Sequence, residues 1–318
     1  MAGLSDVPFR SLAWRMGAGY LVSEMVSSKP ELWETGKSRL RRIPVPGVHP
    51  VAVQIAGTDP LVMAEAARRH EAEGVQVIDI NFGCPAKKVC RKSAGSALLG
   101  DLDLLARIVD HVANAVRIPV TVKTRTGLTP GDRRGVQAAL IAAASGAQMI
   151  VMHARSRACK FKGAVDYTAV SELIADLPPA QRIPVLVNGD IRSVADADKA
   201  LALSGADGVM VGRGALGRPW LFSELTNQQM PSRKERWALV VAHIQHMHEF
   251  YGAPAAVGLV RKHVIAYLQE LDCAEHTQQF LKLTSALDQL SWLQRLIEAD
   301  QAQSPFESVK ITASLLAA

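Results

Sequence analysis

Residues 77–85 read Val-Ile-Asp-Ile-Asn-Phe-Gly-Cys-Pro, an apolar run that ends in polar residues and a turn. The β-branched content and short length of the run predict a buried strand. Asp79 and Asn81 stand at alternate positions, so a strand places both side chains on one face. Polar residues at the carboxyl end of a buried strand are typical of α/β folds, which bind ligands at that end of the sheet.

On both sides of this stretch, short apolar runs alternate with longer amphipathic ones. This alternation is typical of a parallel sheet covered by helices. A helix is predicted at about 8–16, capped by Ser5 or Asp6, and it leaves no room for a strand before it. A second helix is predicted to begin at Asp59-Pro60. The predicted strands are residues 20–24, 51–55, 77–81, 119–123, 149–153, 185–188 and 208–211.

Seven predicted strands leave two architectures open. One is an open doubly wound sheet, and the other is a (β/α)8 TIM barrel whose first strand is missing from the chain. The pattern changes beyond residue 231, where stretches 233–252, 257–271 and 275–300 predict a C-terminal helical bundle. We therefore expect a catalytic barrel at 1–230, a helical domain at 231–300 and a poorly ordered tail at 301–318.

Composition and charge narrow the class of protein. The 318 residues are 48% hydrophobic, which excludes a disordered chain. Residues 1–232 hold 28 basic and 21 acidic residues, whereas residues 233–318 hold 8 and 9. A basic surplus confined to the larger domain favours a polyanionic partner.

The cysteines and the apolar runs predict a cytoplasmic location. Four cysteines in a chain of this length give no disulfide framework, and none has the CxxC spacing of a zinc site, so we expect no metal. The N-terminus does not resemble a signal peptide, and no apolar run approaches the ~20 residues of a membrane span. We expect no membrane association.

Polar side chains occur at the ends of four predicted strands: Gln54, Asn81, Lys123, Arg125, His153 and Arg155. Any one of them could be a solvated lysine or a core histidine. Because the ends of parallel strands meet at one edge of the sheet, their convergence predicts a polar pocket.

The last two predicted strands end in Asn188-Gly189-Asp190 and Gly212-Arg213-Gly214. Glycines at these points let backbone N–H groups approach an anion, and Arg213 supplies positive charge. Loops after the last two strands of a (β/α)8 barrel often hold a phosphate group. No GxGxxG follows an early strand, so the pattern favours a phosphorylated ligand such as FMN over a dinucleotide fold. The alternative is that these glycines only make tight turns.

Cys84 lies in a Gly-Cys-Pro turn at a strand end, within a basic loop where a thiol can donate a proton. Cys159 also lies among basic residues. The basic side chains of these loops are Lys87, Lys88, Arg91, Lys92, Arg125, Arg155, Arg157, Lys160, Lys162, Arg213 and Arg218. Together they predict a positive rim that suits an RNA base presented out of its stack, whereas the run 37–42 is expected to be a solvated face.

Several motifs, taken in chain order, resemble those of the bacterial tRNA-dihydrouridine synthases and are most similar to the B-type. An ordered set of this kind is more specific than any single motif. The motifs are Met1-Ala2-Gly3-Leu4-Ser5-Asp6, Val22-Ser23-Glu24-Met25, Val53-Gln54-Ile55-Ala56-Gly57, residues 79–89, Lys123-Thr124-Arg125-Thr126-Gly127, His153-Ala154-Arg155-Ser156-Arg157, Asn188-Gly189-Asp190-Ile191, residues 212–220 and Arg261-Lys262-His263.

The resemblance implies an FMN-binding (β/α)8 barrel with a C-terminal helical domain that helps to hold tRNA. The implied reaction is the reduction of the uracil C5–C6 bond to 5,6-dihydrouridine with NADPH or NADH as reductant. We expect a monomeric cytoplasmic enzyme. In this family an apolar first strand precedes the Met-Ala-Gly turn, and here Met1 is the first residue of that turn. We therefore expect a truncated chain.

The resemblance also implies roles for individual residues. Cys84 would be the general acid at C5, and Asn81 would contact the uracil edge. The FMN-binding residues would be Met1, Ala2, Gln54, Lys123, His153, Asn188, Gly189, Asp190, Gly212 and Arg213. The tRNA-binding residues would be Lys87, Lys88, Arg125, Arg155, Arg157, Arg261 and Lys262. Two other hypotheses remain open: a tRNA-binding protein that no longer catalyses, and an FMN barrel oxidoreductase that acts on a small molecule.

Overall fold

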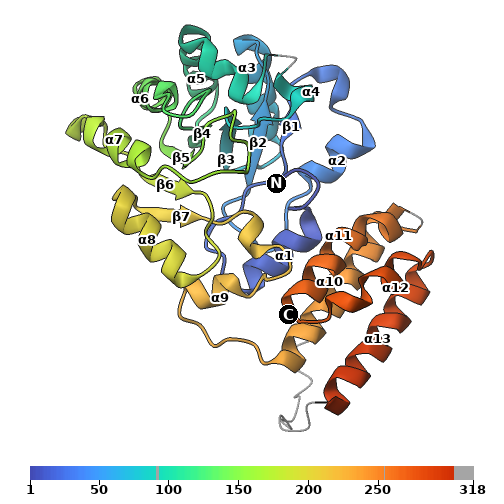
Figure 1. Ribbon diagram of the computed structural model, residues 1–318. Helices are drawn as coiled ribbons and strands as arrows, with labels where there is room; N and C mark the ends of the chain where they lie inside the picture. Colours follow the sequence, from blue (N-terminus) through green and yellow to red (C-terminus); the bar gives the residue numbers. More distant parts are fainter. Residues whose placement is uncertain (91–92, 254, 304–318) are drawn as a thin grey trace. The chain divides into compact units, whose positions relative to one another are not determined.

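The computed structural model describes residues 1–90, 93–253 and 255–303. The chain forms two compact units, Met1–Met230 and a second one that begins at Pro231 (Figure 1). Each unit has its own core, and each is described by itself.

The first unit is built on a parallel sheet. Among the described residues, its seven strands lie side by side in chain order, from β1 to β7, without a reversal (Figure 1). A doubly wound sheet reverses its strand order at a switch point, whereas the wall of a (β/α) barrel runs in sequence. The order therefore confirms the barrel type and excludes the doubly wound alternative. The strands are β1 (Val26–Ser27), β2 (Ala52–Ala56), β3 (Val77–Asn81), β4 (Val120–Arg125), β5 (Met149–His153), β6 (Val185–Asn188) and β7 (Gly208–Met210).

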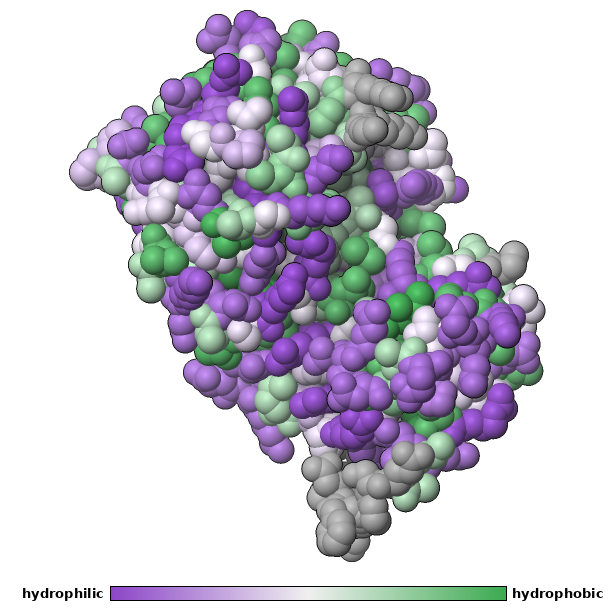
Figure 2. Space-filling model, viewed as in Figure 1, coloured by the Kyte–Doolittle hydropathy of each residue, from purple (hydrophilic) through white to green (hydrophobic). Residues whose placement is uncertain are grey.

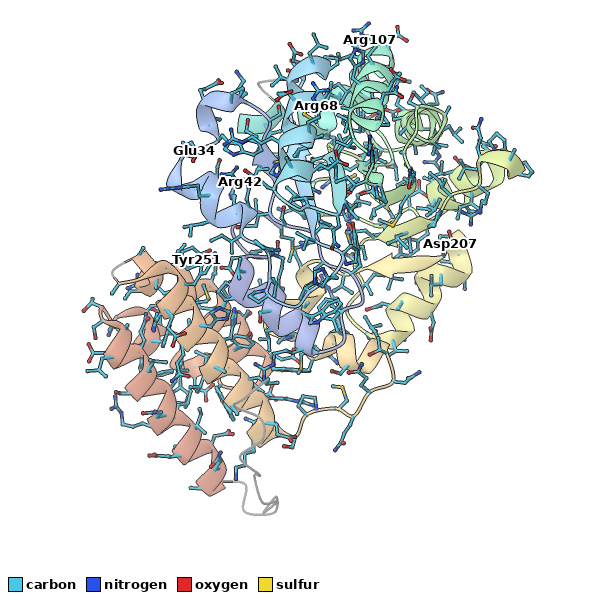
Figure 3. The ribbon with its side chains drawn as sticks, turned by 180° about the vertical axis from the view of Figure 1, so that it is seen from behind. Glu34, Arg42, Arg68, Arg107, Asp207 and Tyr251 are labelled. Atoms are coloured by element: carbon cyan, nitrogen blue, oxygen red, sulfur yellow. The ribbon has the colours of Figure 1, made fainter. Side chains whose placement is uncertain are left out.

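Helices follow the strands and pack against one another around the sheet, α3 on α5, α5 on α6, α6 on α7 and α7 on α8. Arg68 on α3 and Arg107 on α5 point outward from this layer (Figure 3). The helices of the unit are α1 (Val7–Arg15), α2 (Gly36–Arg42), α3 (Pro60–Ala72), α4 (Lys87–Cys90), α5 (Leu102–Ala115), α6 (Arg134–Ala144), α7 (Thr168–Asp176), α8 (Val194–Ser204) and α9 (Leu221–Leu225). Short 3-10 turns are η1 (Pro30–Leu32), η2 (Gly95–Gly100), η3 (Pro179–Gln181) and η4 (Arg213–Ala215).

The alternation of side chains along each strand separates two environments. Apolar residues such as Ile80, Val122 and Met152 pack into the core between strands and helices. Their neighbours in the chain point to the opposite face, because successive strand residues alternate. That face carries Gln54, Asp79, Asn81, Thr121, Lys123, Arg125, His153 and Asn188, so polar groups gather at the carboxyl ends of the strands.

Two helix starts follow the predicted capping. Asp6 accepts a hydrogen bond from the Phe9 N–H at 3.0 Å and begins α1. Asp59 accepts from the Leu61 N–H at 2.9 Å and begins α3, with Pro60 in the first turn.

The prediction of a strand at residues 20–24 is wrong. There only Val22 bridges to Ala52, and the edge strand β1 lies further along the chain, where Val26 pairs with Ile55. The reason is local, because the Ser23 hydroxyl accepts the hydrogen bond of the Gln54 N–H at 3.0 Å in place of a backbone carbonyl. A side chain thus interrupts the backbone ladder at this edge.

The second unit is a helical bundle of α10 (Arg233–Tyr251), α11 (Ala255–Glu270), η5 (Ala274–His276), α12 (Thr277–Leu281) and α13 (Ala286–Gln303). The single helix predicted at 275–300 is wrong, because Ser285 caps a new helix by accepting from the Asp288 N–H at 3.0 Å. Residues 301–303, which were predicted to belong to the tail, continue α13, and residues 304–318 lie outside the described part of the chain.

Hydrogen bonds connect α10 and α13 at one end of the bundle. Asp300 accepts from Arg233 Nε and from Trp237 Nε1, both at 2.8 Å, and buried Trp237, Tyr267 and Phe280 lie in its core. The surface of this unit seen in Figure 2 is mostly hydrophilic. Among the described residues of the whole chain, none of the helices is long and apolar enough to cross a membrane.

Candidate active site

A chain of hydrogen bonds connects β2, β3 and β4 on the polar face of the sheet. The Asp79 carboxylate accepts from Gln54 Nε2 and from the Thr121 hydroxyl, both at 2.6 Å. Gln54 Oε1 in turn accepts from Asn81 Nδ2 at 2.7 Å. Because a carboxylate can only accept, Asp79 sets the direction in which the Gln54 amide points, and Gln54 sets the direction of the Asn81 amide.

The same chain reaches the turn that carries Cys84. Asn81 Oδ1 accepts from the backbone N–H groups of Gly83 at 3.2 Å and Cys84 at 2.9 Å. The Cys84 carbonyl accepts from the Ser96 hydroxyl at 2.8 Å, so both sides of this residue are held. Cys84 is half-buried and is a free thiol. Its position therefore depends on a buried polar network and not on the turn alone.

Asp79 is nearly fully buried, and burial raises its pKa to about 6 although the hydrogen bonds from Thr121 and Gln54 oppose the shift. From the sequence, Asp79 was placed on the polar face but given no role in the site, and Thr121 was not predicted at all. The signal was present for Asp79, because it shares a strand face with Asn81.

Lys123 is the central cation of the polar face. Its Nζ donates to Asn188 Oδ1 at 3.1 Å, and Asn188 Nδ2 donates to the Met210 carbonyl at 2.7 Å. Burial, together with the positive charge of Arg125, lowers the pKa of Lys123 to about 8. Lys123 as a whole is half-buried, and an ammonium group with a single amide partner retains the capacity to bind an anionic group.

His153 offers a buried acceptor beside Lys123. Its Nδ1 lies 3.1 Å from the Asn188 carbonyl, which can only accept, so Nδ1 carries the proton of the neutral ring. Burial and the positive charges of Lys123 and Arg125 lower the pKa of His153 to about 3, so the ring is neutral at physiological pH. The Nε2 lone pair is buried and has no hydrogen-bond partner among the described residues. It suits a hydroxyl or N–H donor of a ligand.

Arg125 and Arg155 lie beneath the loops. Arg125 is 3% exposed and donates to the carbonyls of Gly83, Ser156 and Lys160 at 2.6, 3.1 and 2.9 Å. Arg155 is 4% exposed and donates to Asp190 Oδ1 at 2.8 Å and to the Gly163 carbonyl at 3.0 Å. Sequence analysis placed both guanidinium groups on an exposed rim, whereas the structure uses them to organise the loops.

The turns after β6 and β7 lie together. Gly189 has φ +140°, and a Cβ there would lie 3.0 Å from Val165 Cγ1, so the turn favours glycine. A Cβ at Gly214 would lie 2.0 Å from the Ile191 carbonyl oxygen, which brings the two turns into direct contact. A Cβ at Gly212 would lie 3.7 Å from Met1 Sδ, so the first residue also lies at this end of the sheet.

The other residues predicted for the site are distributed as follows. Arg213 follows β7, lies 3.6 Å from Asp190 and is 42% exposed, and Ala2 is exposed in the first turn. Arg157 is half-buried in the loop after β5. Arg261 and Lys262 belong to α11 of the second unit, where Arg261 Nη2 donates to the Leu283 carbonyl at 3.2 Å. Arg91, Lys92 and the side chains of Lys87 and Lys88 lie outside the described part of the structure.

A sequential parallel sheet with a thiol, a half-buried lysine, a neutral histidine and glycine turns at its carboxyl edge defines an enzyme of the (β/α)-barrel type. The chain belongs to the dihydrouridine synthase family, whose model matches residues 1–304.

Two sequence relatives agree with this assignment. The chain is 44% identical to the tRNA-dihydrouridine synthase B of Salmonella typhimurium, with 94% of this chain and 93% of that protein covered. It is 46% identical to the tRNA-dihydrouridine synthase B of Pseudomonas aeruginosa, with 89% and 86% covered. Among solved structures, mandelate oxidase is similar over 68% of this chain and 61% of its own, with 21% identity and a TM-score of 0.41.

Proposed function

We propose that this protein is a tRNA-dihydrouridine synthase of the B type that binds FMN and uses NADPH or NADH to reduce uridines in tRNA. The observation that carries the proposal is the hydrogen-bonded chain from Asp79 to Cys84, which holds a thiol at the same strand edge as Lys123 and His153. The family match over residues 1–304 supports the same reaction.

The residues at the strand ends fit FMN. Lys123 would lie at the pyrimidine edge of the flavin, where its charge stabilises an anionic ring. His153 Nε2 is a buried acceptor without a partner among the described residues, which suits a hydroxyl or N–H group of the cofactor. The backbone at Gly189 and Gly212, with the Arg213 side chain, would hold the phosphate. FMN, when bound and reduced by NAD(P)H, supplies the hydride that adds to C6 of the uracil.

Three more of the predicted cofactor residues lie at this edge of the sheet and could contact FMN. Gln54 is linked to Asn81 and would bond the flavin ring with its second amide hydrogen, and Met1 and Ala2 lie in the turn beside Gly212. Asp190 is paired with Arg155, so its carboxylate shapes the phosphate turn and does not itself bind an anion.

Cys84 would complete the reduction by proton transfer. Hydride addition at C6 leaves enolate-like charge that must be protonated at C5, and a thiol held at that atom can donate the proton as a general acid. Asn81 holds the Cys84 N–H through Oδ1, so its remaining Nδ2 hydrogen can donate to a uracil carbonyl.

The basic surplus of the first unit supports tRNA as the substrate. Lys160 and Lys162 are exposed on a loop at the carboxyl edge and would contact phosphates of tRNA, as would Arg157, Lys87 and Lys88. We further propose that residues 1–230 catalyse, that residues 231–300 contribute Arg261 and Lys262 to tRNA binding, and that the enzyme works as a monomer in the cytoplasm.

The test uses the purified protein and tRNA that lacks dihydrouridine. The protein should be yellow and should form dihydrouridine with NADPH, as measured by mass spectrometry of tRNA digests. A colourless protein that binds tRNA without forming product would favour a binding function. Cys84→Ala should abolish product while NADPH still bleaches the flavin, whereas Cys159→Ser should keep both reactions. Product formation by Cys84→Ala at the wild-type rate would show that the general acid is another group.

A further inference from the structure

An exposed aromatic side chain lies on the loop after β5. Phe161 is 51% exposed, and it is followed by exposed Lys162 and preceded by exposed Lys160. The proposed flavin site and the proton donor do not use it. An exposed phenyl ring gains little from folding, because its apolar surface remains in water.

The loop backbone is nevertheless held firmly on both sides of Phe161. Lys160 has φ +51°, a left-handed conformation that is unfavourable for a lysine. Buried Arg125 bonds the Lys160 carbonyl at 2.9 Å, and buried Arg155 bonds the Gly163 carbonyl at 3.0 Å. The Ala158 N–H adds a bond to the Leu128 carbonyl at 2.9 Å. The structure thus keeps the ring of Phe161 at one place on the surface.

Two guanidinium groups lie over the ring. The guanidinium carbon of Arg213 lies 4.8 Å from the ring centroid and that of Arg125 lies 5.6 Å away. Arg213 Nη2 also lies 3.5 Å from the Phe161 carbonyl. An aromatic face among lysines and arginines is the combination with which proteins bind unpaired nucleotides, since the ring stacks on a base and the cations bind phosphates.

The Phe161 ring and the Cys84 turn contact the same side chain, Arg125. The Arg125 guanidinium that faces Phe161 also donates to the Gly83 carbonyl, which immediately precedes Cys84. One side chain therefore spans the distance between the aromatic ring and the turn of the proton donor. A nucleotide stacked on Phe161 would be a close neighbour of the uridine at Cys84 in the same RNA strand.

We propose that Phe161 is a stacking platform for an unpaired base of tRNA that is adjacent to the target uridine. This inference rests on the proposed function, because it assumes an RNA substrate. It assigns a further substrate-binding residue, which recognises a base by its flat face and therefore tolerates different bases at that position.

The experiment measures tRNA binding as a function of salt for Phe161→Ala, Phe161→Leu and Phe161→Trp. Loss of one stacked base should weaken binding roughly 5- to 100-fold. The slope of affinity against salt should stay unchanged, because no charge is removed, whereas Lys162→Ala should reduce the slope by about one. Phe161→Leu should bind as weakly as the alanine variant, and Phe161→Trp should bind like the wild type. Leu61→Ala, which removes a 69% exposed apolar side chain from α3, is the matched control.

A second measurement reports stacking directly. 2-Aminopurine, placed next to the target uridine on either side in turn, should be quenched by wild-type protein at one of the two positions and not by Phe161→Ala. Affinity of Phe161→Ala within twofold of the wild type, or full affinity of Phe161→Leu, would overturn the platform. If the wild type binds tRNA but forms no dihydrouridine, the proposed function fails while the binding series still decides the role of Phe161. If the wild type binds no tRNA, both proposals fail.

Discussion

The hydrogen-bonded chain from Asp79 to Cys84 has a direction, and exchanging a single group within it should place two acceptors against each other. Asn81→Asp replaces the NH2 group that donates to Gln54 with a second oxygen, so two acceptors would face each other at a position where the donor and acceptor are now 2.7 Å apart. Gln54 cannot turn round, because its carbonyl would then face the Asp79 carboxylate, which is now 2.6 Å from Nε2. While both carboxyl groups are ionised, the conflict has no local solution.

A buried polar group that loses its partner costs about 1–3 kcal/mol, and more for a charged group. We therefore expect Asn81→Asp to lower the free energy of unfolding by about 2–3 kcal/mol at pH 8, where Asp79 is ionised because its pKa is about 6. The double variant Asp79→Asn with Asn81→Asp keeps the net charge. The amide introduced at position 79 can donate to a reversed Gln54, which then donates to the carboxylate at position 81.

The assay is urea unfolding of wild type, both single variants and the double variant at pH 8. The single variant Asp79→Asn should be no less stable than the wild type, because it removes a buried charge. The double variant should be more stable than the sum of the two single effects predicts, by at least about 1 kcal/mol.

A control separates the effect of the direction of the Gln54 amide from the repulsion between carboxylates at positions 79 and 81. The same four proteins are compared with Gln54→Met in the background, where the amide link is gone and only the repulsion between positions 79 and 81 remains. The coupling should fall there. If the single effects add within about 0.5 kcal/mol, or if the coupling is the same with methionine at position 54, the directional chain does not operate.

Two further predictions concern pH. Because the pKa of Lys123 is about 8, the rate of tRNA reduction should fall as the pH rises above that value. Lys123→Arg should move this decline to higher pH. A wild-type rate that stays constant to pH 10 would contradict the role of the ammonium group. Burial raises the pKa of Asp79 to about 6 in the folded protein, so its contribution to stability is fully present below its unfolded pKa of ~3.9 and is lost as the pH rises through 6. Asp79→Asn should lack this loss, and its stability relative to the wild type should rise by roughly 2 kcal/mol between pH 4 and 7 in chemical unfolding; an unchanged difference would refute the buried charge.

Sequence patterns located the buried strands well. Strands β3, β5 and β6 lie at the predicted residues, because a short β-branched run between turn residues has few other stable conformations. The edge strand was misplaced because β1 pairs with β2 alone and a serine side chain takes part in its hydrogen bonding. The break between α12 and α13 was missed because the helical apolar pattern continues through a serine that caps a new helix.

Charge patterns were less informative about arginines. Arg125 ends a strand and Arg155 follows one, as residues of an exposed rim would. The sequence does not show that carbonyl groups of the loop after β5 accept their hydrogen bonds. Burial of a guanidinium group requires several acceptors in fixed positions, which only the folded loops supply.

By itself, the sequence determined which residues stand at the carboxyl ends of the strands, and hence which chemistry is available: a thiol, an ammonium group, an imidazole and glycine turns. The period of two along each strand and the capping residues are local properties, so they can be read without the fold. The tertiary structure alone decided the direction of the Gln54 and Asn81 amides, the protonation of His153 and the exposure of Phe161. Each depends on the register between strands and on loops far apart in the chain, because hydrogen-bond partners and burial are set only when those segments meet.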